Sequence, residues 1–206
     1  MRNMFGRAWV AAAVLLVSAG AAHAHIIASR LGDFYAGALH PLTDLQDIIL
    51  WAAMGVLAGS VGASTGRWLV LVFPLGLLAG LGLGLAFGLG SAGAMADAGA
   101  IAVLGLLLVA NMQIPAALLC VIAVGLALWR GAANAGDLGP ETNWPLFAAG
   151  LAGAGYAAIT LTMALTVAFR GTDAGASMAW RGIAIRAFGS WIAAIGLMMG
   201  GFALAS

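Results

Sequence analysis

Apolar runs and short polar breaks alternate along the whole chain. Six runs follow one another, at roughly 43–62, 68–88, 92–111, 114–130, 144–169 and 181–204. Most of them approach the ~20 residues that a helix needs to cross the hydrocarbon core of a bilayer. The runs are continuous, whereas the strands of a membrane barrel alternate apolar and polar residues. The pattern therefore predicts an all-α fold, a polytopic transmembrane helical bundle of about six helices.

The polar breaks add detail at two places. Residues 26–39 are mildly amphipathic, which predicts a helix at the outer membrane interface, and Pro41 fits the first turn of the helix that follows. The third and fourth runs are short and are divided only by residues 111–115. They form either two separate membrane helices or a re-entrant pair.

The N-terminus follows the pattern of a secretory signal. Arg2 and Arg7 form a basic region before the apolar residues 8–17, and residues 22–24 read Ala-His-Ala, the A-x-A form of a cleavage site. We predict a signal peptide over residues 1–24 and a single transmembrane domain over residues 25–206, with His25 at the mature N-terminus. The alternative is an uncleaved first membrane helix, although its apolar run is shorter than a span.

Composition supports a membrane location and excludes several functions. Of 206 residues, 64% are hydrophobic and only 7% are charged, against ~25% charged in soluble domains, and the mean hydropathy is +1.08. The lipid bilayer is thus the expected partner, and a net charge of +1 offers no basic patch for nucleic acid. The sequence has no P-loop and no nucleophile elbow, so we do not expect an enzyme.

The arginines predict an orientation. If the mature N-terminus is outside, the inner loops hold Arg67, Arg170 and Arg181, and the outer segments hold Arg30 and Arg130. This distribution agrees with the positive-inside rule, and an export signal points the same way. We therefore predict a multi-pass protein of a bacterial inner membrane with its mature N-terminus in the periplasm.

The densest group of potential metal ligands lies at the start of the first membrane helix. His40, Asp44 and Asp47 are spaced i, i+4, i+7 and would share one helix face, and His25, with a free α-amine after cleavage, could fold back onto them. Imidazole and carboxylate together suit divalent ions such as Ni, Zn, Co, Cu or Mn. The alternative is that these residues bind no metal. His40 and Asp44 would then begin the helix, where a carboxylate is favourable by ~0.3–1 kcal/mol, and Asp47 would reach the headgroups.

Acidic residues gather on the predicted outer side. Those on or near it are Asp33, Asp44, Asp47, Asp97, Asp137 and Glu141. An acidic mouth raises the local concentration of cations. For Asp137 and Glu141, ordinary solvated loop positions are the favoured explanation.

Glycines repeat every four residues through the second apolar run, at Gly76, Gly80, Gly84 and Gly88. Small residues at this spacing let helix backbones approach closely in lipid, where no hydrophobic force drives helices together. The repeat predicts tight helix packing and carries no information on chemistry.

One short motif carries a family resemblance. His40 and Pro41, then Asp44, then Gln46 and Asp47 before an apolar helix resemble the first-helix motif of the HupE/UreJ family of hydrogenase and urease accessory membrane proteins. In that family the motif runs His-Pro-x-x-Gly-x-Asp-His. The resemblance implies about six helices after a cleaved signal. It also implies transport of nickel, or a related divalent metal, across the inner membrane.

The chain departs from that motif at several positions. Asp44 stands at the motif glycine, Gln46 and Asp47 stand at its Asp-His pair, and residues 134–141 hold no histidine where many members carry a second histidine-rich segment. Replacing imidazole by carboxylate moves a site toward harder cations.

The sequence is therefore consistent with two functions. The first is binding or transport of a divalent, nickel-like metal ion at an outward-facing site formed by His25, His40, Asp44 and Asp47. The alternative is a non-transporting accessory or structural subunit, whose helices contact other subunits of a larger membrane complex.

Overall fold

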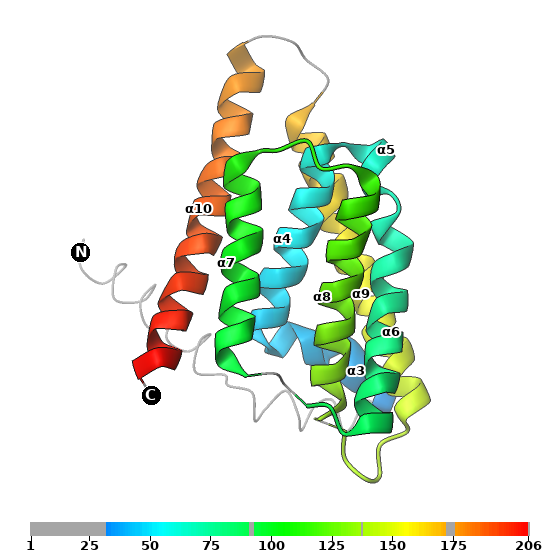
Figure 1. Ribbon diagram of the computed structural model, residues 1–206. Coiled ribbons are helices and arrows are strands. Elements are labelled where there is room, and N and C mark those ends of the chain that lie inside the picture. The colour runs from blue at the N-terminus through cyan, green and yellow to red at the C-terminus, as the bar shows by residue number, and fades with distance from the viewer. Residues whose placement is uncertain (1–31, 91–92, 137, 172–175, 206) are drawn as a thin grey trace, which may run out of the picture.

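The computed structural model describes residues 32–90, 93–136, 138–171 and 176–205, and these parts of the chain fold as helices joined by short connections (Figure 1). The helices are α3 Asp33–Thr43, α4 Leu45–Val61, α5 Ala63–Gly66, α6 Leu69–Phe87, α7 Ala94–Ala110, α8 Ala116–Ala135, α9 Trp144–Arg170 and α10 Ala176–Ala205. The six long helices, α4 and α6 to α10, correspond one to one with the six apolar runs. The predicted all-α bundle is confirmed.

Several helices are suited to a bilayer by length and apolar composition. Four stretches of the described chain can cross it, namely Ala63–Phe87, Ala116–Ala135, Trp144–Arg170 and Trp180–Ala205, and the bent pair α3 and α4 is a fifth candidate if it counts as one span. The 17-residue α7 is a shorter apolar helix. It runs along the bundle as a helix separate from α8 (Figure 1).

The chain turns sharply at Asp44. The axes of α3 and α4 differ by 81°, because Asp44 has an extended backbone and its side chain accepts a hydrogen bond from the N–H of Gln46, at 2.8 Å. Two expectations are therefore wrong. Pro41 lies in the last turn of α3 rather than the first turn of the next helix, and His40, Asp44 and Asp47 do not share a face of one continuous helix.

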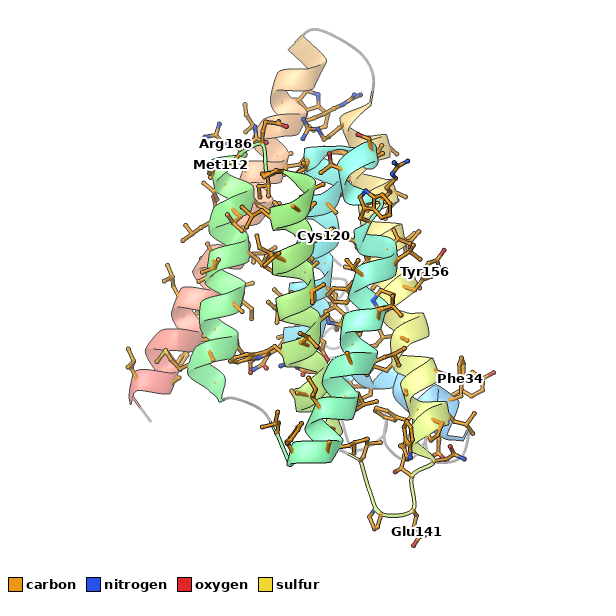
Figure 2. All side chains as sticks on the ribbon, turned by 45° about the vertical axis from the view of Figure 1, so that its right-hand side comes forward. Phe34, Met112, Cys120, Glu141, Tyr156 and Arg186 are labelled. Atoms are coloured by element: carbon orange, nitrogen blue, oxygen red, sulfur yellow. The ribbon has the colours of Figure 1, made fainter. Side chains whose placement is uncertain are left out.

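The core of the bundle is built around α4. Its buried face includes Leu50, Trp51 and Met54, and the Trp51 ring meets the ring of Phe73 on α6 edge to face, with centroids 5.6 Å apart. Around it, α6 packs closely on α8, α7 packs closely on α10, and α3 and α4 pack on α9. The exterior is apolar along most of its length, as a bilayer environment requires (Figure 2).

Three of the four repeated glycines lie at the α6–α8 contact. A Cβ at Gly76 would stand 2.7 Å from the Ala127 Cβ, and one at Gly84 would stand 2.6 Å from the Ala135 Cβ. A Cβ at Gly80 would collide with the backbone of α8. The expected packing role of Gly88 is wrong: this residue ends α6 in the left-handed conformation, and a Cβ there would meet nothing within 4 Å.

Candidate functional site: a buried arginine among three carboxylates

Arg130 lies near the end of α8, and its side chain reaches into the bundle, where it is only 4% exposed. Its Nε donates to Oδ1 of Asp47 at 2.6 Å, and its Nη1 donates to Oδ1 of Asp97 at 3.0 Å. Its Nη2 pairs with Oδ2 of Asp44. We call these four residues the Arg130 cluster. Three carboxylates face one guanidinium, so the cluster carries an excess of two formal negative charges.

Local structure explains how α4 supplies two of the carboxylates. Asp44 is the N-cap of α4, where one of its oxygens accepts the Gln46 N–H and the other faces Arg130. Asp47 lies in the first turn of the same helix, where the helix dipole favours a negative charge. The two differ in access: the Asp47 side chain is fully buried, whereas that of Asp44 is 31% exposed.

The third carboxylate comes from the first turn of α7. Asp97 is buried, and besides Arg130 it accepts a hydrogen bond from Nε1 of Trp129 at 3.0 Å. Trp129 and Arg130 are adjacent on α8, so one carboxylate receives two donors from that helix. These bonds join α7 and α8, whose facing side chains otherwise line an apolar cavity of about 240 Å³.

A polar cavity of about 200 Å³ opens beside the Arg130 cluster. Its lining consists of His40, Asp44, Gln46, Arg130, Ala133, Asn134 and Gly136, and we call it the His40 cavity. Asn134 lies one turn after Arg130, and its Nδ2 donates to the Arg130 carbonyl at 2.6 Å and to Asp47 Oδ2 at 3.4 Å. Its Oδ1 is buried with no hydrogen-bond partner within the described chain. A buried oxygen without a partner is unfavourable by about 1–3 kcal/mol.

The donors of the His40 cavity are an imidazole, a carboxylate and two amide oxygens. This mixture suits a first-row divalent cation better than a soft one, because no thiolate contributes. In the described part of the chain, no three His, Cys, Asp or Glu side chains stand in an arrangement that holds a metal ion. The carboxylates of the Arg130 cluster turn toward the guanidinium instead.

The predicted ligands are brought together only in part. Asp44 and Asp47 meet at Arg130, and His40 lines the cavity beside them, with its ring 5.9 Å from that of Phe147 on α9. His25 lies outside the described residues. The predicted cleavage after residue 24 also falls outside them.

Sequence reasoning missed the partner of the acids. It used Arg130 only as a marker of orientation and placed Asp97 in a general acidic mouth, and it gave Asn134 and Trp129 no role in the site. A usable signal was present, because ionisable residues in membrane helices commonly pair with one another, and Arg130 is flanked by apolar residues near the end of a membrane helix.

The fold and the site together define a class of protein, a multi-pass helical membrane protein with a charged site buried at one end of its bundle. Within that class, the model of the family described as "HupE / UreJ protein" matches residues 12–199, and the chain belongs to this family. No curated protein and no solved structure matches the chain. Membership of this family indicates a membrane accessory protein for metal handling.

Proposed function

We propose that this protein binds a divalent metal ion, nickel or a similar first-row ion, in the His40 cavity and passes it across a bacterial inner membrane. The observation that carries the proposal is the joint presence of the polar cavity and a cluster with two formal negative charges in excess beside it. A dication balances that excess. The donor types and the family both support a metal as the transported substrate.

Accessibility suggests an order of contacts. Asp44 is partly exposed and His40 lines the cavity, so these two meet the arriving ion first. Asp47 is fully buried behind them and receives the ion afterwards. A volume of about 200 Å³ leaves room for an ion that keeps part of its water shell. His25, at a free mature N-terminus, would add an imidazole and an amine at the same mouth.

The arginines at the end of the bundle opposite the His40 cavity support the proposal that this end faces the cytoplasm. Glu141 follows α8 at the end that holds the cavity, and Arg186 lies at the other end (Figure 2). There, Arg170 donates to the Ser60 carbonyl, and Arg181 donates to the Arg170 carbonyl at 2.9 Å. Arginines near helix ends favour the cytoplasmic side, so the His40 cavity would open to the periplasm.

The test is accumulation of radioactive nickel in bacterial cells that lack their own nickel importer and are grown at limiting nickel. We expect the wild-type protein to raise accumulation and Asp44→Asn to reduce it at least about tenfold, since a charged ligand is lost. Asp33→Asn is the matched control: Asp33 is at the start of α3, outside the cavity, and accepts the Asn143 N–H at 3.0 Å.

Equal accumulation with wild type, Asp44→Asn and empty vector would overturn the transport proposal. It would favour the accessory-subunit function, in which the helices mainly contact other proteins. If the wild-type protein does raise nickel accumulation, repeating the assay with cobalt and zinc defines which first-row ion the site prefers.

A further inference from the structure

We propose that Arg130 is a built-in competitor of the transported metal. Its guanidinium holds the carboxylates that an incoming divalent cation needs, so the ion binds by displacing Arg130 from them. This inference rests on the proposed function, because the competing ligand is the same metal. It assigns Arg130 a positioning role that goes beyond the proposed function.

The geometry places the guanidinium at the centre of the cluster. Each of its three nitrogens meets a carboxylate from a different position: Asp47 at Nε, Asp97 at Nη1 and Asp44 at Nη2. Arginine stays charged at every physiological pH, and its planar fork matches several oxygens at once. A metal ion must meet the same oxygens to bind tightly, so the two cations exclude one another.

The charge balance makes displacement feasible. The guanidinium neutralises only one of three carboxylates, whereas a dication neutralises two. An ion in the His40 cavity reaches Asp44 from the exposed side, and the unpaired Oδ1 of Asn134 offers a further ligand. Arg130 has a polar contact to retain as it moves, because Nη1 also donates to Oε1 of Gln46 at 3.2 Å.

Displacement of Arg130 would also weaken the contact between α7 and α8. The Nη1 atom links α8 to Asp97 on α7, across an interface where the other facing side chains line an apolar cavity. Releasing this bond leaves Asp97 with the Trp129 hydrogen bond. The pair formed by α7 and α10 then has one polar link fewer to the rest of the bundle, so metal entry loosens it.

The experiment compares Ni²⁺ affinity by calorimetric titration of the full mature chain, purified in detergent. The informative variant is the double substitution Arg130→Gln with Asp97→Asn. It removes one positive and one negative charge, so its cluster keeps the wild-type excess of two negative charges but has no resident cation. An Asn at this position still accepts the Trp129 N–H. The single variant Asp97→Asn, which keeps Arg130, is the matched control.

If Arg130 competes, the double variant binds Ni²⁺ at least about tenfold more tightly than wild type, and Asp97→Asn binds no more tightly than wild type. Equal affinity of the double variant and wild type would show that net charge alone matters, and would overturn the inference. Arg130→Lys serves if the double variant does not fold. Lysine lacks the fork that spans three carboxylates, so this variant should also bind more tightly than wild type, and equal or weaker binding would contradict the competition.

The outcome is separable from that of the transport assay. Nickel accumulation by wild type with no gain of affinity in the double variant means that transport stands and competition fails. Tight Ni²⁺ binding by the double variant, without transport by wild type, means that Arg130 blocks a cation site that this chain no longer uses. In that case competition stands and transport fails.

Discussion

Nε of Arg130 lies 2.6 Å from Oδ1 of Asp47, although 83 positions separate the two residues in the chain. The pair joins the last turns of α8 to the first turn of α4 inside the bundle. With Asp44 and Asp97 it concentrates charge at one end of a protein that is otherwise apolar along most of its length. Charges inside a membrane protein are unfavourable unless they are paired, and they commonly mark a pathway for ions.

Removing the guanidinium should destabilise the bundle strongly. Arg130→Ala leaves Asp47 and Asp97 buried without their main partner, which is unfavourable by about 3–5 kcal/mol. The measurement is the free energy of unfolding in mixed micelles, titrated with a denaturing detergent. Arg186→Ala is the control, because the exposed Arg186 donates only one described hydrogen bond, from Nε to the Val109 carbonyl at 3.1 Å. A loss under about 1 kcal/mol is expected there, and equal losses for the two variants would contradict the account.

The indole of Trp129 should contribute through its hydrogen bond as well as its bulk. Trp129→Phe keeps an aromatic ring but removes the donor to Asp97, and a hydrogen bond to a charged group contributes about 1.5–3 kcal/mol. The same unfolding titration measures the loss. Trp191→Phe, at a site 74% exposed on α10, is the control and should change stability little. A Trp129→Phe protein as stable as wild type would show that the bond does not hold α7.

Adding a single methyl group to a glycine of α6 should destabilise the bundle only on the helix face that packs against α8. Gly80→Ala forces a Cβ into the backbone of α8 and should destabilise the bundle by about 1–3 kcal/mol, as overpacking does. Gly82→Ala, two residues further along α6, meets nothing within 4 Å and should cause no loss. Unfolding titrations of the two variants compare the faces directly. A tolerated Gly80→Ala would mean that α6 and α8 approach less closely than described.

The helices could be predicted from the sequence because hydrophobic runs report length and burial in lipid, both of which are local properties. The turn at Asp44 could not be predicted in the same way. A regular spacing of His40, Asp44 and Asp47 assumes one continuous helix, and the competing N-cap interaction of Asp44 with the Gln46 N–H ends that helix instead. Short-range side-chain bonds of this kind override periodicity.

Only the part of the site that lies in one short segment of the chain could be predicted. Asp44 and Asp47 stood out because they are close in sequence, whereas Arg130 and Asp97 join them only when α4, α7 and α8 meet. Such a meeting depends on long-range packing. From the predicted topology, the three acids of the cluster and Arg130 were expected on the same side of the membrane. A topology argument gives the side of the membrane but not which side chains meet.

The mature N-terminus decides whether His25 can offer a free amine as well as its imidazole. We predict that the mature protein begins at His25, because residues 22–24 have the form of a signal-peptidase site. Mass spectrometry of the purified protein, with N-terminal sequencing, measures this directly. A mature chain that still contains residue 24 would remove the free amine from position 25 and exclude an amine–imidazole chelate there.

The most direct test of metal entry through the His40 cavity is the position of the ion itself. Crystals of the full mature chain, grown with Ni²⁺, should show an anomalous-scattering peak within about 2.0–2.2 Å of a His40 nitrogen or an Asp44 oxygen, as first-row ions bind such ligands. An Arg130 side chain moved away from Asp44 should accompany it. A cavity without a nickel peak, or nickel bound only elsewhere on the protein, would contradict the account.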